Sequence, residues 1–275
     1  MQDSVSYNDM DIDPKDIIGD RGTLARGLRL LYLLAEFGRP VGLAELTAAS
    51  GYTKPTVFRL ARTLVELGFV KQSPQNSFYS LTPRVLSLGH KYLAGMSLRD
   101  HALPRMHNLV EQFDENVSLA VLDGTDVVYI ERLETNATGL TFKLSVGSRM
   151  PAYGSSMGRC ILAWLPEAQR SEILDKSNFE KFTEFTIYER AKIEEAIANA
   201  RRLGFSINDQ ETEIGVISIG VAIFDCDAVP IGGMNFAAPS TRISRRFLEE
   251  EVAPVLMKYA NEISCASPFT NLGGG

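Results

Sequence analysis

The chain has 275 residues, of which 45% are hydrophobic and 23% charged, as in an ordinary folded protein. This length predicts two domains, each able to bury a core, or one large domain. No segment approaches the ~20 apolar residues of a membrane span, and the acidic start lacks the apolar core of a signal peptide, so we expect a cytoplasmic protein. The cysteines show no CxxC spacing, which argues against a disulfide framework or a zinc site: Cys160, Cys226 and Cys265.

Charge is distributed unevenly along the chain. The formal net charge is −6, and residues 1–20 contain six acidic residues and one basic residue. Residues 21–91 contain ten basic residues and three acidic ones, a net charge of +7. The rest of the chain is acidic overall. A compact basic segment attached to an acidic body is typical of a domain that binds phosphates.

The N-terminal part begins with a predicted disordered tail, residues 1–20, which have few large apolar groups. Residues 23–37 are predicted to form a helix with Thr23 as its N-cap. Leucines at helical spacing predict the buried stripe of this helix. They are Leu24, Leu28, Leu31 and Leu34.

Two further helices are predicted, over residues 43–50 and 53–67. Thr53 is the expected N-cap of the longer one, Pro55 lies in its first turn, and Gly68 ends it. The two helices are separated by a short turn that contains glycine, a pattern typical of a helix-turn-helix.

A hairpin follows, with strands on either side of the polar segment Ser73–Ser77. Three helices and a basic hairpin predict a winged helix-turn-helix over residues 21–82. A helical linker is expected over residues 83–104, with a break or a new first helical turn at Pro104.

After residue 116 the hydrophobic period changes from helical to alternating. Strands are predicted on both sides of the turn Asp123–Asp126, over residues 141–146, and in three later segments that begin at Phe205, Ile217 and Pro230. One helix is predicted to begin at Gly154, a second to end at Gly204, and a third to lie near the C-terminus. Hairpin strands with helices on their faces predict an α+β fold with an antiparallel sheet, over residues 105–266, before a short tail of residues 267–275.

The third helix divides into a buried and a polar face, as a helix that reads DNA requires. Val57, Leu60, Ala61, Leu64 and Leu67 are expected to be buried. Arg59 is the candidate for a bidentate guanine contact, and Phe58 either touches a thymine methyl or packs under the wing. The other candidates suit phosphates, the DNA backbone or the minor groove: Arg26, Lys54, Thr56, Arg62, Lys71, Gln72, Gln75 and Asn76.

From residue 21 onward, the sequence resembles the IclR family of bacterial regulators. Within that family it is most like the PcaR/PcaU/PobR branch, which regulates aromatic-acid breakdown through the β-ketoadipate pathway. The resemblance rests on several segments together, among them TLARGLRLL, TKPTVFRLARTLVELGFV, VGSRMPAYGSSMGRCILAWL, GFSINDQETEIGVISIGVAIFD and APSTRIS.

The resemblance implies a GAF-like effector domain, a dimer or a dimer of dimers, palindromic promoter DNA and a small carboxylate effector. It also implies an effector pocket at the turn into the helix near Ser155, where free backbone N–H groups favour an anion. Arg149, just before that turn, either pairs with the effector or forms a structural salt bridge. The implied pocket residues are Ser155, Ser156, Met157, Asn208, Asp209, Ser218, Asn235 and Ala237.

An enzyme is the first alternative, with a domain acting on a small carboxylate fused to the helix-turn-helix. No nucleophile, metal or phosphate-binding motif supports it, and no metal or cofactor is expected. Cys160 is expected to be a buried small hydrophobe, and Asp209 and Glu211 to have binding or structural roles. The second alternative is an adaptor whose winged helix binds a protein. RNA polymerase is a further partner if the effector acts while DNA stays bound.

Overall fold

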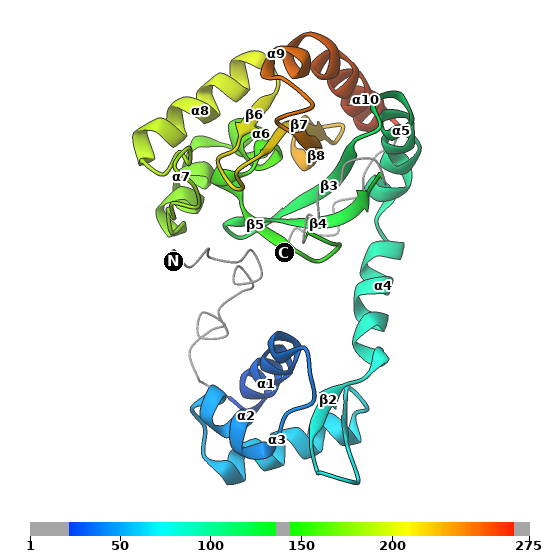
Figure 1. Cartoon of the computed structure of the whole chain (residues 1–275), viewed down its shortest axis with the longest axis vertical. Helices are drawn as coiled ribbons and strands as arrows, with labels where there is room; N and C mark the ends of the chain where they lie inside the picture. The colour runs from blue at the N-terminus through cyan, green and yellow to red at the C-terminus, as the bar shows by residue number, and fades with distance from the viewer. Residues whose placement is uncertain (1–21, 136–143, 267–275) are drawn as a thin grey trace. The chain divides into compact units, whose positions relative to one another are not determined.

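The structure is a computed structural model that describes residues 22–135 and 144–266. The chain divides into two compact units between Gly95 and Met96 (Figure 1). The predicted tails, residues 1–20 and 267–275, lie outside the described residues. Each unit has its own core and is described by itself.

The N-terminal unit contains three packed helices followed by a two-stranded hairpin and a further helix (Figure 1). Strands β1 and β2 are antiparallel, and Tyr79 of β2 also forms a bridge with Val41. The predicted winged helix-turn-helix is therefore present. Its elements are α1 (Thr23–Phe37), α2 (Leu43–Ser50), α3 (Lys54–Glu66), β1 (Val70–Gln72), β2 (Tyr79–Leu81), a 3-10 turn (Pro83–Val85) and α4 (Leu86–Ala94).

The core of this unit corrects the predicted stripe of α1. Leu24 and Leu28 are 78% and 44% exposed, and Leu67, expected in the stripe of the third helix, is 53% exposed. Because α1 carries leucines on several sides, spacing alone did not determine which side packs. The side that α1 buries carries Leu30, Leu33 and Leu34.

The helix ends follow the sequence in most places. Thr53 is the N-cap of α3 and Pro55 lies in its first turn, as predicted. Gly68 has φ +77°, a left-handed conformation that favours glycine, directly after the helix. The predicted capping role of Thr23 is wrong, because Gly22 is the N-cap of α1 and Thr23 is already helical.

The C-terminal unit is a six-stranded antiparallel sheet with the order β5-β4-β3-β8-β7-β6. Its strands are β3 (Asn116–Asp123), β4 (Asp126–Leu133), β5 (Arg149–Pro151), β6 (Ser206–Asp209), β7 (Val216–Phe224) and β8 (Pro230–Pro239). Its helices are α5 (Ser97–Phe113), α6 (Ser156–Trp164), α7 (Glu167–Lys176), α8 (Arg190–Leu203), α9 (Arg245–Phe247), a π-helical turn (Leu248–Val252) and α10 (Ala253–Cys265).

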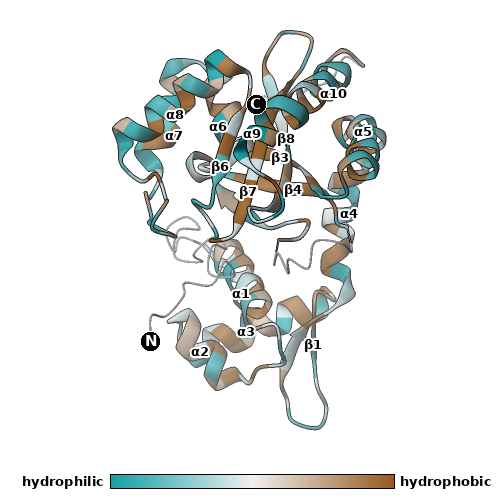
Figure 2. Cartoon of the chain, turned by 45° about the horizontal axis from the view of Figure 1, so that its top comes forward, coloured by the Kyte–Doolittle hydropathy of each residue, from teal (hydrophilic) through white to brown (hydrophobic). Residues whose placement is uncertain are grey.

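Helices cover both faces of this sheet. Helices α5 and α10 contact one face, and α6 lies on the other face and packs against α8. Strand residues alternate between the faces: Ser218 and Gly220 of β7 face α6, and Phe236 of β8 packs against Phe113 of α5. Figure 2 shows β3 and β7 in brown, the colour of hydrophobic residues, as expected for strands covered on both faces.

Two local predictions for this unit need correction. The break expected at Pro104 is wrong, because α5 continues through it. Proline removes one backbone hydrogen bond, and burial of Leu98, Ala102 and Met106 compensates for this loss. The predicted boundary between residues 104 and 105 therefore lies inside α5. Of the strand predicted over residues 141–146, residues 141–143 lie outside the described residues and the rest is not a strand.

A close approach between α6 and the sheet fixes the position of this helix. A Cβ atom on Gly220 would lie 2.3 Å from the backbone nitrogen of Met157. Only glycine therefore permits this spacing between β7 and the first turn of α6. The first turn of α6 lies directly over β7 as a result.

Candidate functional site

The polar face of α3 is exposed and basic. Lys54 and Arg59 are exposed and form no ion pair with any described residue. Arg62 is exposed and is held by Glu66, with 2.9 Å between Nε and Oε1. Phe58 is 49% exposed and outside the core, so it remains available for an external contact. Thr56 is half-buried, and its hydroxyl lies 3.0 Å from that of Thr53 at the helix start.

The wing presents one cation and several residues that stabilise the hairpin. Lys71 is exposed on β1. Gln72 donates to the carbonyl oxygen of Ser77 at 3.3 Å, and the side-chain oxygen of Asn76 accepts from the N–H of Phe78 at 3.1 Å. Gln75 accepts from Ser73 at 2.9 Å. Sequence reasoning placed these amides in the wing, and the structure gives them local contacts as well.

Arg26 of α1 lies beside the start of α3. Its guanidinium carbon is 5.6 Å from the ring centroid of Tyr52, the residue just before the N-cap of α3. Arg29 stacks on the same ring at 5.4 Å. A basic group is therefore positioned at the N-terminal end of the candidate recognition helix, where a phosphate would be favoured.

A cavity in the C-terminal unit lies at the start of α6, between this helix and the sheet. Ser155 is the N-cap of α6 and accepts from the N–H of Gly158 at 3.3 Å. The hydroxyls of Ser156 and Ser218 lie 3.1 Å apart. The lining consists of Tyr129, Arg132, Leu144, Met150, Ser155, Ser156, Asn208, Thr212, Glu213, Val216, Ser218, Asn235 and Ala237.

Most of the predicted pocket residues are brought together here, and two are not. Met157 is fully buried in the hydrophobic core instead of lining the cavity. Asp209 does not line the cavity, because it follows Asn208 on β6 and strand residues alternate in direction. The predicted residues that do line the cavity are Ser155, Ser156, Asn208, Ser218, Asn235 and Ala237.

Sequence reasoning missed Arg132, the only arginine or lysine among the described residues that line the cavity. It lies on β4 opposite Ser118, to which its Nη1 donates at 3.2 Å, and its Nε donates to Glu134 at 2.7 Å. The side chain is only 5% exposed. A basic residue near the end of a strand rich in apolar residues was the available signal, but the pairing of β3 with β4 decides which face it occupies.

The cavity also holds an unused acceptor and little free space. The Oδ1 atom of Asn235 is buried and accepts no hydrogen bond from the described residues. The cavity volume is about 30 Å³, which suffices for water but lies far below the roughly 300–1,000 Å³ of typical ligand pockets. A ring-sized ligand therefore requires the lining side chains to move apart.

Comparison with known families agrees with this arrangement. Residues 90–265 match the C-terminal domain of the bacterial transcriptional regulator IclR, and residues 23–74 match the IclR helix-turn-helix domain. The chain belongs to the IclR family. The predicted α+β fold class, a winged helix-turn-helix with a helical linker and an effector domain built on an antiparallel sheet, is confirmed.

Individual IclR-family relatives cover most of the chain. The Pca regulon regulatory protein of Pseudomonas putida is 32% identical over 241 residues, covering 88% of this chain and 82% of that protein. This likeness supports the PcaR/PobR branch. A crystal structure of a transcriptional regulator from Rhodococcus sp. RHA1 has a TM-score of 0.76 and 34% identity, covering 88% of this chain and 96% of the other.

A third relative shares the fold at lower identity. The crystal structure of an IclR homolog from Microbacterium hydrocarbonoxydans, complexed with 4-hydroxybenzoate, has a TM-score of 0.74 and 23% identity, covering 88% and 98% of the two chains. The curated relatives are transcriptional regulators, so this IclR-family chain is a DNA-binding regulator with an effector-binding domain and not an enzyme.

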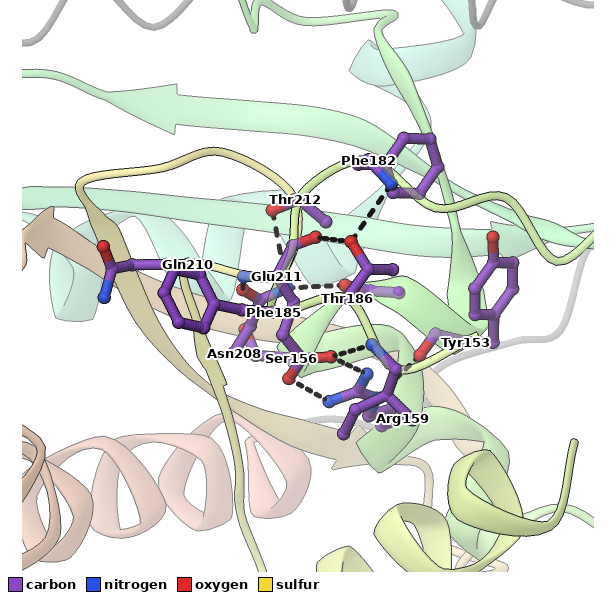
Figure 3. A network of polar contacts seen from close by, with 12 residues as sticks. Tyr153, Ser156, Arg159, Phe182, Phe185, Thr186, Asn208, Gln210, Glu211 and Thr212 are labelled. Atoms are coloured by element: carbon purple, nitrogen blue, oxygen red, sulfur yellow. Dashed lines mark hydrogen bonds and ion pairs between the residues drawn. The ribbon is translucent and has the colours of Figure 1, made fainter. Parts of the chain in front are cut away.

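A buried polar network lies next to the cavity and includes some of its lining residues (Figure 3). The Nη1 and Nη2 atoms of Arg159 donate to the carboxylate of Glu211, at 2.8 and 2.5 Å. Asn208 donates to the carbonyl oxygen of Gly154 at 2.6 Å and accepts from the N–H of Glu211 at 3.1 Å. The network therefore joins α6 to the loop after β6, which carries Thr212 into the cavity.

The remaining candidates have structural partners. Arg149 pairs with Asp123 and Asp126 at 2.7 and 3.1 Å and does not line the cavity, so the structural salt bridge is the correct alternative. Burial raises the pKa of the Cys160 thiol, which donates to the carbonyl oxygen of Gly220. Within the described ranges, no group of His, Cys, Asp and Glu residues could hold a metal, and no helix is long and apolar enough to cross a membrane.

Proposed function

We propose that this IclR-family regulator binds palindromic promoter DNA as a homo-oligomer, and that a small aromatic carboxylate in the α6 cavity controls it. The observation that carries the effector class is Arg132, a cation already oriented by Ser118 and Glu134 in the same cavity as the unused acceptor of Asn235. An effector with a carboxylate at one end and a hydroxyl at the other complements both groups.

The known relatives support an aromatic acid. The similar protein of Pseudomonas putida regulates the Pca regulon, and the Microbacterium homolog binds 4-hydroxybenzoate. The walls of the cavity carry Tyr129, Leu144 and Met150, which offer apolar surface to a ring. A β-ketoadipate-pathway intermediate would use the same cation without stacking on these walls.

DNA binding is assigned to the exposed face of α3 and to the wing. Arg59 reads a base, Lys54 and Lys71 contact phosphates, and Arg26 contacts a phosphate near the helix start. One winged helix makes few phosphate contacts, so specific binding requires two copies on a two-fold symmetric site.

The second copy has an exposed apolar surface available for contact. Helix α4 buries no residue within the described chain. It carries large apolar side chains that are 59–70% exposed, namely Leu86, Leu88 and Tyr92. A nine-residue helix is not stable without packing. We assign this helix, with the exposed Leu24 and Leu28 of α1, to contact between two copies of the chain.

Control by the effector follows from the narrow cavity. Because the cavity holds about 30 Å³, a ring can enter only if the walls separate, so the effector selects a second arrangement of the domain. A coupling of about 1–3 kcal/mol would change DNA affinity by roughly 5–150-fold. In the alternative scheme the DNA affinity is unchanged and contact with RNA polymerase changes instead.

Calorimetric titration tests the effector. The ligands are 4-hydroxybenzoate, protocatechuate, β-ketoadipate, cis,cis-muconate, pyruvate and glyoxylate, with the uncharged 4-hydroxybenzamide as control. We expect a hydroxylated benzoate to bind, the amide to bind far more weakly, and Arg132→Gln to weaken the acid about tenfold or more. Equal binding of acid and amide would contradict the carboxylate role.

DNA titration with and without the bound acid then separates the two schemes. A changed affinity for a palindromic promoter fragment supports control through DNA binding. An unchanged affinity assigns the effect to RNA polymerase.

Sedimentation of Tyr92→Glu, with Tyr188→Glu in the other unit as control, tests the α4 contact. An unchanged oligomeric state in Tyr92→Glu would contradict this contact.

A further inference from the structure

A second concave site lies at the opposite end of α6 from the effector cavity. It is a groove between the end of α6, helix α7 and helix α8, with a volume of about 550 Å³. This volume lies within the range of ligand pockets, roughly 300–1,000 Å³, so a ligand can enter without displacing side chains. At the floor, Leu165, Leu174 and Ile197 are buried, and the carboxylates of Glu167 and Glu194 also line the groove.

Arginines contributed by two helices line this groove. Arg190 is already oriented, since it pairs with Asp175 at 2.8 Å and Glu194 at 2.6 Å and donates to Ser171 at 3.4 Å. Arg170 lines the groove and forms no ion pair with any described residue. Its guanidinium therefore has no carboxylate of the described chain within ion-pair distance, although Glu167 lines the same groove.

Arg201 connects the groove to α6. Its Nη1 donates to the carbonyl oxygen of Ala163 at 3.1 Å, and its guanidinium carbon lies 3.7 Å from the ring centroid of Trp164. The residue is exposed, so its other donors remain open to a ligand. A cation at this position also stabilises the C-terminal end of the helix through the helix dipole.

We infer that this groove is a second ligand site, which binds a small amphipathic carboxylate between Arg170 and Arg201 with its apolar body over the exposed Ala198 and the edge of Leu165. The planar guanidinium groups suit a carboxylate, and contact with Ala198 and Leu165 removes part of the apolar ligand surface from water. An inorganic anion would gain only the charged contact and should bind less well.

The groove and the effector cavity are joined by one short helix. Helix α6 has nine residues, which span about 13 Å. Ser155 and Ser156 at its start line the cavity, and Ala163 near its end contacts Arg201. A carboxylate that draws Arg201 away from Ala163 removes a C-terminal stabilising contact from the helix on which the cavity is built.

Calorimetric titration of the full-length protein with 2-naphthoate, benzoate and inorganic phosphate tests this site. We expect 2-naphthoate to bind more tightly than benzoate, and phosphate to bind most weakly. Fluorescence of Trp164, the only tryptophan in the chain, should change on binding. Arg170→Gln and Arg201→Gln should each weaken 2-naphthoate binding about tenfold or more.

Two control variants separate this site from the effector cavity. Arg202→Gln removes a charge from the same helix outside the groove lining, and Arg132→Gln removes the cation of the effector cavity. Binding that survives both controls and is weakened by Arg170→Gln supports the groove. Binding lost only in Arg132→Gln would place the ligand in the effector cavity and overturn the inference. Failure of all three probes to bind at millimolar concentration would also overturn it, and would leave the proposed effector function to its own test.

Discussion

Arg159 of α6 and Glu211 of the loop after β6 form a buried bidentate ion pair, 52 residues apart in sequence. The two side chains are 1% and 7% exposed. The hydroxyl of Thr186 donates to the backbone carbonyl oxygen of Glu211 (Figure 3). The backbone N–H of Ile187 donates to the carboxylate of Glu211. The pair therefore fixes the loop that supplies Thr212 and Glu213 to the effector cavity.

Breaking this pair should be strongly destabilising. Arg159→Met leaves a buried, uncompensated carboxylate, and we expect it to lower the free energy of unfolding by about 3–5 kcal/mol. The double variant Arg159→Met with Glu211→Leu should recover much of that loss, because no charge remains buried. Urea denaturation measures both. A loss below about 1 kcal/mol in the single variant would show that the loop is held by other contacts.

The spacing between α6 and β7 predicts a strong effect of one methyl group. Gly220→Ala places a Cβ 2.3 Å from the backbone nitrogen of Met157, so α6 must shift, at a cost of about 1–3 kcal/mol or more. The matched control is Gly89→Ala in α4, where an added Cβ meets nothing within 4 Å. Alanine should stabilise this helix by about 0.5–1 kcal/mol relative to glycine. Thermal unfolding and effector titration check both. Wild-type effector affinity in Gly220→Ala would contradict the assigned spacing.

Stability should depend on pH through Glu115, between α5 and β3. Burial raises its pKa from 4.5 to about 7, partly opposed by Arg242, while the charge of Asp114 raises it further. The folded state therefore holds the proton more tightly than the unfolded state. Between about pH 4.5 and 7 the free energy of unfolding from this group falls as pH rises, and above pH 7 the loss is complete.

The variant Glu115→Gln removes this titration. Relative to the wild type, its stability should improve steadily as pH rises from 5 to 7.5, measured by urea denaturation at each pH. The exposed Gln112→Ala, which changes no ionisable group, is the control. A constant difference between Glu115→Gln and wild type across this range would mean that Glu115 is already ionised when folded.

The recognition face predicts two distinct DNA phenotypes. Arg59→Ala should cost about 1–3 kcal/mol and relax selectivity at one base pair of each half-site. Lys54→Ala should weaken binding to all sequences similarly and reduce the slope of log K against log salt by about one per copy. Titration of operator and scrambled DNA at several salt concentrations distinguishes them, with Lys176→Ala of α7 as control. If Arg59→Ala behaves like Lys54→Ala, Arg59 contacts a phosphate.

The sequence by itself determined the order of elements and the two-part organisation. Helical spacing, caps and turns located α3 and its polar face, because these signals act over a few neighbouring residues. Local charge density singled out the basic module. The start of α6 near Ser155 was located in the same way, whereas the resemblance to the IclR family placed the effector pocket there.

Only the tertiary structure decided which side of each element packs and which distant residues share the cavity. Leu24 and Leu28 fit a helical stripe yet are exposed, because burial depends on the helices that pack against α1. Arg132 enters the cavity through the pairing of β4 with β3, and Asp209 stays out of its lining, since a strand alternates its side chains between two faces. Strand register and long-range packing join residues that are far apart in the chain, and no local pattern of residues encodes those contacts.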